Sequence, residues 1–128
     1  ARGTPQRPSD LAGHEVIQFV GTGLLSEWRF IENGREIRVP VTSRFATNST
    51  DAAVLHAAQG GGLINVLAYQ VGNQIEAGQL KIVLAKYELP PMPIHLVYPT
   101  SRLLSAKVRA FIDLVVAQTG WRFGTRQR

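Results

Sequence analysis

Few side chains in this sequence have the types and spacing that chemistry requires. Three histidines, His14, His56 and His95, lie far apart, and none belongs to a nucleophile–base pattern. A zinc site needs clustered ligands, such as two histidines one helical turn apart, and that spacing is absent from the sequence. There is no cysteine, which excludes thiolate metal sites and disulfides. The sequence therefore predicts neither an enzyme nor a metal or cofactor site.

A predicted helix start offers a different kind of chemistry. Asn48, Ser49 and Thr50 are residue types that cap helices, and they precede the helix-forming run DAAVLHAAQ. Unpaired amides and the helix dipole at such a start favour an anion or a carboxylate ligand. Alternatively, these side chains only cap their own helix, and Asp51 in the first turn would repel an anion. Both interpretations stay open.

The strands that would position this helix start are predicted from short apolar runs. Asn33 and Gly34 supply the positive φ angles of a tight turn, which predicts a hairpin over Glu27–Val41. Trp28, Phe30 and Phe45 are expected to form one buried face rather than a stacking surface for nucleic acid. The other predicted strands are His14–Val20, Leu63–Leu67, Lys81–Ala85 and Ile94–Tyr98.

Glycines delimit the predicted helices. The helix that begins near Asn48 ends at Gly60–Gly62, and a second helix over about Ala68–Ala77 ends at Gly78. Apolar residues at helical spacing predict a last helix that ends at Gly120. A short turn is expected through Leu11 and Ala12. Alternating strands and helices indicate an α/β layered sandwich with a mixed sheet, in one domain.

Charge does not indicate a nucleic-acid-binding chain, although the net charge is +5. Five of the 14 basic residues lie outside the segment from the first to the last acidic residue, and the nine others balance its nine acidic residues. We interpret the basic ends as solvated tails. No apolar run approaches the about 20 residues of a membrane span, and no secretory signal is present, which favours the cytoplasm. The start is compatible with the cut edge of a longer protein.

The order of the segments resembles a known family over about Gly3–Ala117. The segments are TPQRPSDLAGHEVIQF, the hairpin, RFATNSTDAAVLHAAQGGGLINVLAYQV, IEAGQLKIVLAKYE and PMPIHLVYPTSRLLSAKVRAFIDLVV. This series resembles the effector-binding domain of LysR-type transcription regulators, and no single motif in it is diagnostic. Ala68 departs from the proline that many relatives have after the preceding strand.

The resemblance implies a fold similar to type 2 periplasmic binding proteins, with two α/β subdomains, two crossover segments and an effector cleft between them. We expect residues of about 5–92 to form the second subdomain. Residues 93–120 would form a crossover strand and a C-terminal helix that return to the first subdomain, and residues 121–128 would form a basic tail. The winged helix-turn-helix and the first subdomain are not among the 128 residues, so this chain alone is not expected to bind an operator.

The resemblance also implies a binding site, for which position in the family and two physical features are the guides. Glycines let a ligand approach the backbone, and a helix start supplies donors. Packing is the alternative at each position, and for Phe19 and Ile94 it is the favoured one. The candidate effector-binding residues are Phe19, Gly21, Thr22, Asn48, Ser49, Ile94 and His95.

The resulting hypothesis is a ligand sensor within a bacterial transcription regulator. A small metabolite, with an anion as one candidate, would close the two subdomains and change the geometry of a homodimer or tetramer that holds DNA-binding domains. No cofactor and no membrane contact are implied. The alternative is a stand-alone small-molecule-binding module of periplasmic-binding-protein type without a DNA-binding domain, which the sequence upstream of Ala1 would distinguish.

Overall fold

The computed structural model describes residues 3–20, 27–98 and 105–118 in two compact units. The first unit is Ala1–Pro90 and the second is Pro91–Arg128. The first unit holds all the strands of the described residues, and the second holds the last helix. Each unit is considered by itself below.

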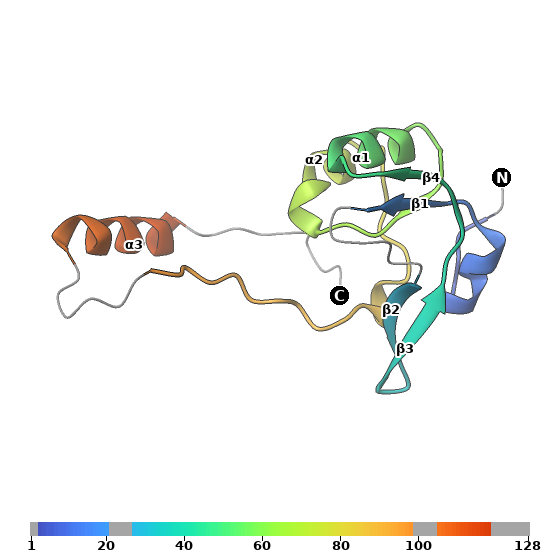
Figure 1. Ribbon diagram of the computed structural model, residues 1–128, viewed down its shortest axis with the longest axis horizontal. Coiled ribbons are helices and arrows are strands. Elements are labelled where there is room, and N and C mark those ends of the chain that lie inside the picture. The colour runs from blue at the N-terminus through green and yellow to red at the C-terminus, as the bar shows by residue number, and fades with distance from the viewer. Residues whose placement is uncertain (1–2, 21–26, 99–104, 119–128) are drawn as a thin grey trace. The chain divides into compact units, whose positions relative to one another are not determined.

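A parallel sheet forms the centre of the first unit (Figure 1). Among the described residues its order is β4 (Ser43–Thr47), β1 (Val16–Phe19) and β5 (Leu63–Ile64). The predicted strands around β1 and β5 are confirmed, although both are shorter than expected. The β4 strand was not predicted, because Phe45 is its only large apolar residue among polar and small neighbours.

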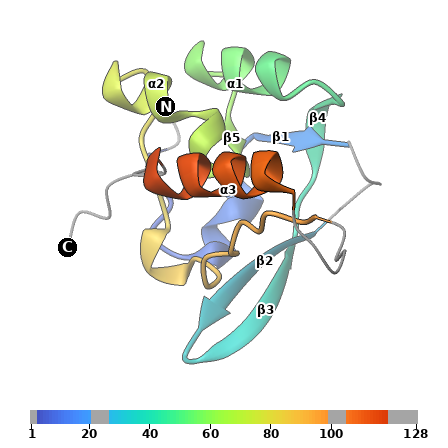
Figure 2. The same cartoon turned by 90° about the vertical axis from the view of Figure 1, so that its left-hand side faces the viewer.

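Helix α1 (Thr50–Ala58) covers one face of this sheet, as the turned view in Figure 2 also shows. Ile17 is 2% exposed and packs in one buried cluster with Ala53, which is 1% exposed, and Ala57. The two small residues bring the helix backbone close to β1. The predicted helix start near Asn48 is confirmed, since Ser49 is the N-cap residue.

The opposite face packs against a second apolar cluster. The hairpin of β2 (Glu27–Glu32) and β3 (Arg35–Pro40) is confirmed, with φ of +51° at Asn33 and +76° at Gly34. Both strand polarities of the predicted mixed sheet are therefore present, in two separate sheets. The cluster joins the hairpin and the 3₁₀ helix η1 (Pro8–Gly13) to β1 through the buried residues Leu11, Val16, Phe30 and Val41.

Two predicted strands are absent from the described residues, and both predictions were wrong. Lys81–Ala85 has no strand partner, and Leu84 takes a left-handed φ of +59° before the 3₁₀ helix η3 (Ala85–Tyr87). Ile94–Tyr98 has no strand partner in the described part of the chain either. A strand needs backbone partners as well as apolar side chains, and a pattern of side chains does not reveal whether partners are present.

The predicted helix over Ala68–Ala77 is divided into two short pieces. The 3₁₀ helix η2 (Ala68–Gln70) is followed by α2 (Gly72–Glu76), and Val71 between them is buried. A buried β-branched residue followed by glycine is a poor helix interior, which explains the break. Gly78 ends this segment as predicted, with a φ of +70°.

The second unit contains α3 (Ala106–Gln118), which confirms the predicted C-terminal helix. Its predicted end at Gly120 falls outside the described residues. No described residue of α3 is buried, and four of its large apolar residues are exposed, namely Val108, Phe111, Leu114 and Val116. Val97, in the segment before it, is 92% exposed. Apolar surface of this extent is typical of a face that packs against another structure.

Asp10 makes the stability of the first unit depend on pH. Its Oδ2 accepts hydrogen bonds from the backbone N–H groups of Gln6 (2.8 Å) and Arg7 (3.1 Å), which lower the pKa of the carboxyl below 3.8. Stabilisation by the carboxylate is therefore present above the unfolded-state pKa and is lost as pH falls through the lower folded-state pKa.

We expect Asp10→Asn to lower the unfolding free energy at pH 7, and the difference from the parent chain to shrink below about pH 4. Urea titrations at pH 7 and pH 3 measure both values. Glu76→Gln, an exposed carboxylate of α2, is the control and should change little at either pH. A difference for Asp10→Asn that is equal at both pH values would contradict the role of the carboxylate charge.

Candidate functional site

The carboxyl end of β1 lies beside the turn that leads into α1. Phe19 is the register partner of Thr47, and the Val20 N–H donates to the Thr47 carbonyl oxygen at 2.9 Å. Asn48 and Ser49 follow directly. The structure thus brings three of the predicted site residues, Phe19, Asn48 and Ser49, to one edge of the parallel sheet. This is the edge at which open α/β sheets bind their ligands.

The turn into α1 is held by its own hydroxyl groups. The Ser49 N–H donates to Thr47 Oγ1 at 3.0 Å, and Ser49 Oγ accepts from the Ala52 N–H at 3.3 Å. Self-capping, one of the two interpretations from the sequence, is therefore present at Ser49.

Donors nevertheless remain at this turn for a ligand. The Asn48 side chain is exposed, and within the described residues it has no hydrogen-bond partner. The first amides of a helix have no intrahelical acceptor, so those of Thr50 and Asp51 also face outward at the helix start. These groups donate to an anion or a carboxylate, and the Asp51 side chain disfavours a ligand of high negative charge.

The other predicted site residues lie elsewhere. Gly21 and Thr22 fall outside the described residues. Ile94 and His95 belong to the second unit and are exposed there. Of the predicted site residues, Phe19, Asn48 and Ser49 are thus the ones that lie together in the first unit.

The far end of α1 is closed by glycines, as predicted. The Gly60 N–H donates to the Ala57 carbonyl, and the Gly61 N–H to the His56 carbonyl, both at 2.9 Å. Gly60 has a φ of +86°, the left-handed conformation that ends many helices. This pair of hydrogen bonds fixes where α1 ends.

Phe45 does not share a face with Trp28 and Phe30, so the prediction that groups these three aromatic residues was wrong. It lies on β4 and stacks against His56 of α1, with ring centroids 4.5 Å apart, and it is 38% exposed. Trp28 and Phe30 do share the inner face of the hairpin. The prediction failed for Phe45 because Pro40 ends β3 and β4 belongs to the other sheet.

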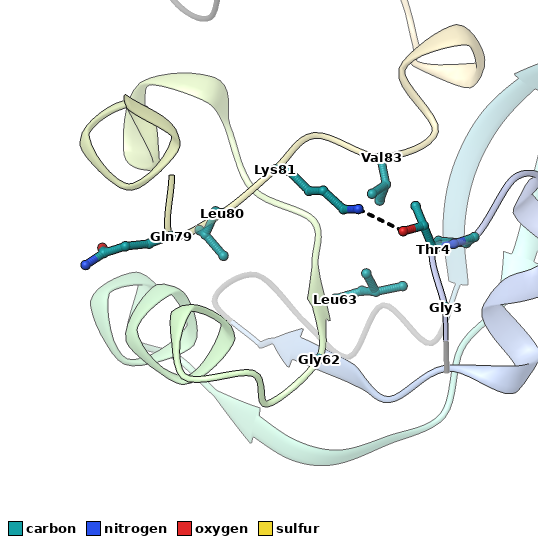
Figure 3. Close-up of a pocket in the computed structure, with 9 residues that line it drawn as sticks. Gly3, Thr4, Gly62, Leu63, Gln79, Leu80, Lys81 and Val83 are labelled. Carbon is teal, nitrogen blue, oxygen red and sulfur yellow. Dashed lines mark hydrogen bonds between the residues drawn. The ribbon is translucent and has the colours of Figure 1, made fainter. Parts of the chain in front are cut away.

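A cavity of ≈ 190 Å³ that the sequence did not indicate lies beside β5 (Figure 3). One wall is the N-terminal segment, where Lys81 Nζ donates to Thr4 Oγ1 at 2.8 Å. His14 holds the same segment from the other side, with its Nε2 at 3.3 Å from the Gly3 carbonyl oxygen. The residues that line the cavity are Gly3, Thr4, Pro5, Gly62, Leu63, Gln79, Leu80, Lys81 and Val83.

The sequence did not indicate that His14 joins two segments, because one of its partners is four residues away in the chain and the other is eleven residues away. His14 reaches the Asp10 carbonyl, four residues earlier, because the short helix η1 brings these two residues together. The contact with Gly3 depends on how the N-terminal segment folds back, which no local pattern reveals. Within residues 3–20, 27–98 and 105–118 there is no group of three or more potential metal ligands.

Comparison with known proteins identifies the family. Residues 1–120 match the LysR substrate binding domain. The HTH-type transcriptional regulator PgrR of Escherichia coli is 33% identical over 115 residues, which are 88% of this chain and 38% of that protein. The HTH-type transcriptional activator AaeR of the same species is 30% identical over 112 residues, 87% of this chain and 36% of that protein. The chain thus spans well under half the length of these curated relatives.

Solved structures agree with the sequence comparison. The regulatory domain of AphB from Vibrio vulnificus matches with a TM-score of 0.74 and 25% identity, over 89% of this chain and 56% of that domain. CrgA, a LysR-type transcriptional regulator from Neisseria meningitidis, matches with a TM-score of 0.61 and 26% identity, over 70% of this chain and 30% of that one.

Regulatory domains of this kind have a fold like that of type 2 periplasmic binding proteins, so the fold class predicted from the sequence is confirmed. No helix in the described ranges is long and apolar enough to cross a membrane. Because the family model matches residues 1–120, this chain belongs to the LysR substrate-binding domain family.

Proposed function

We propose that this chain is the effector-sensing part of a bacterial LysR-type DNA-binding transcription regulator. Residues of about 5–92 form its second subdomain, residues 93–120 return to the first subdomain, and residues 121–128 form a basic tail. The relatives PgrR and AaeR are HTH-type regulators, which supports a regulatory role and no enzymatic one. A protein that acts on DNA in a bacterium works in the cytoplasm.

The observation that carries the proposal is the meeting of the β1 end with the α1 start. The pairing of Phe19 with Thr47 places Asn48, Ser49 and the first amides of α1 at one edge of the sheet. A small metabolite with an anionic or carboxylate group fits these donors. The proposal also assigns effector contacts to Gly21 and Thr22, which follow β1 in the sequence, and to Ile94 and His95.

The exposed apolar face of the second unit supports the rest of the proposal. Ile94, Leu96 and Tyr98 are exposed, as are Val108, Phe111, Leu114 and Val116 of α3. The match covers 56% of the AphB regulatory domain, so a complete domain has further chain to cover such a face. We assign that cover to the first subdomain. Closure of the two subdomains around the metabolite then alters the geometry of a homodimer or tetramer and its binding to DNA.

The test is a binding measurement on the full-length regulator. A panel of small mono- and dicarboxylates is screened by thermal shift, and the affinity of each hit is measured by calorimetry. We expect Asn48→Ala to weaken the affinity for the best ligand by about 5- to 150-fold, as loss of one hydrogen bond of about 1–3 kcal/mol implies. Gln59→Ala, at the opposite end of α1, is the control and should leave the affinity unchanged.

Two outcomes would overturn the proposal. One is a reading frame upstream of Ala1 that has no helix-turn-helix pattern in the segment of about 160 residues that we expect there. The other is a ligand whose affinity changes equally in Asn48→Ala and Gln59→Ala, because the α1 start would then not be part of its site.

A further inference from the structure

The imidazole of His14 bridges two backbone carbonyl oxygens. Its Nδ1 lies 2.9 Å from the carbonyl oxygen of Asp10, and its Nε2 lies 3.3 Å from that of Gly3. Carbonyl oxygens only accept hydrogen bonds, and a neutral imidazole has a single N–H group. The neutral ring therefore donates to one carbonyl and presents a lone pair to the other. The protonated ring, with two N–H groups, donates to both.

We propose that His14 is a proton-operated latch, which ties the N-terminal segment Gly3–Pro5 to η1 when its imidazole is protonated. When the imidazole is neutral, one of the two hydrogen bonds is lost. Histidine is the side chain whose charge ordinarily changes between about pH 5 and pH 8. The latch does not depend on the proposed effector or on DNA binding.

The charged groups around the ring come from the elements that pack against it. Asp10 of η1 supplies a carboxylate, which accepts from Gln6 and Arg7 and interacts favourably with a cationic ring. Arg7, the residue before η1, carries a positive charge. Glu15 follows His14 in the chain, and Lys81 approaches the N-terminal segment from the far side. Charges of both signs are therefore present on these elements, and only the protonated ring can donate to both carbonyl oxygens.

The latch acts on a wall of the cavity. Gly3, Thr4 and Pro5 line it, and Lys81 Nζ holds Thr4 Oγ1 at 2.8 Å from across the space (Figure 3). The hydrogen bond from Lys81 does not involve the imidazole, so it remains when His14 loses its proton. The segment is thus held from two sides when the ring is protonated, and from the Lys81 side alone in the neutral tautomer that donates to Asp10. The position of the Gly3 peptide, and with it the opening of the cavity, would therefore depend on the protonation state of His14.

Nuclear magnetic resonance of the 128-residue chain tests the latch. The carbonyl ¹³C shift of Gly3 and the ring ¹⁵N shifts of the histidines are followed from pH 5 to pH 8. We expect the Gly3 carbonyl to titrate with the same midpoint as the His14 ring. His14→Gln should abolish this titration, and His56→Gln, which alters a ring that stacks on Phe45, should leave it intact.

Three results would overturn the proposal. They are a Gly3 carbonyl that does not respond to pH, a response that persists in His14→Gln, and a midpoint that follows His56 or His95 in place of His14. The comparison of midpoints needs only the parent chain, so the test stands even if His14→Gln does not fold.

Discussion

Replacing Gly62 with alanine is expected to lower the unfolding free energy by about 3 kcal/mol or more, because two penalties combine. Gly62 has a φ of +141°, a conformation that residues with a side chain rarely adopt. A Cβ at this position would also lie 2.5 Å from the Glu15 carbonyl oxygen. That oxygen accepts from the Leu63 N–H at 2.9 Å, so it cannot move without breaking the β1–β5 pairing.

Gly60→Ala is the matched control for this prediction. Gly60 also has a positive φ, +86°, but a Cβ there meets nothing within 4 Å. We expect it to lower stability by about 1–2 kcal/mol, the penalty of the left-handed backbone alone. Urea titrations followed by circular dichroism measure both variants. If Gly62→Ala were no more destabilising than Gly60→Ala, the close approach to Glu15 would not be what requires glycine.

Truncation of Ile17 to alanine is the second large effect, at about 2–5 kcal/mol of unfolding free energy. Ile17 of β1 is 2% exposed, and its side chain packs against the small residues Ala53 and Ala57 of α1. Truncation of its side chain leaves a cavity and removes a central contact between α1 and the sheet. Because a domain is stable by only about 5–15 kcal/mol, the loss is a large fraction of the total.

Leu55→Ala provides the comparison on the same helix. Leu55 has the same number of side-chain carbons as Ile17 but is 61% exposed on the outer face of α1. Its truncation should change stability by no more than about 0.5 kcal/mol. Chemical denaturation of both variants measures the contrast. Similar losses would mean that the outer face of α1 is covered in solution and would contradict the packing of Ile17 as the reason for its effect.

Local signals in the sequence were sufficient for several elements. Asn33 and Gly34 supply the φ angles of the hairpin turn, and Ser49 and Gly60 mark the ends of α1. Each of these features depends on residues within one turn of the chain. Lys81–Ala85 and Ile94–Tyr98 are different, because an apolar run becomes a strand only beside a partner. Neither has one among the described residues, and the side-chain pattern holds no information about that.

For the candidate site, too, the sequence indicated the local features but not the contacts between distant segments. The residue types of Asn48 and Ser49 indicated a helix start, and the pairing of Phe19 with Thr47 brought β1 to it. The pairing itself was not foreseen, since β4 has only one large apolar residue. The contacts of His14 with Gly3 and of Lys81 with Thr4 join distant segments, so they become visible only in three dimensions.

The two sheets of the first unit differ in how far along the chain their partners lie. In the hairpin, Glu32 pairs with Arg35 across a two-residue turn, whereas Val16 pairs with Ser43 on one side and Leu63 on the other. Hairpins close in about 1–10 μs, while pairing of distant segments first requires large loops to close. The hairpin is therefore able to form early during refolding. The parallel sheet that carries the candidate site would be completed late, because the segment that forms α1 separates β4 from β5 in the chain.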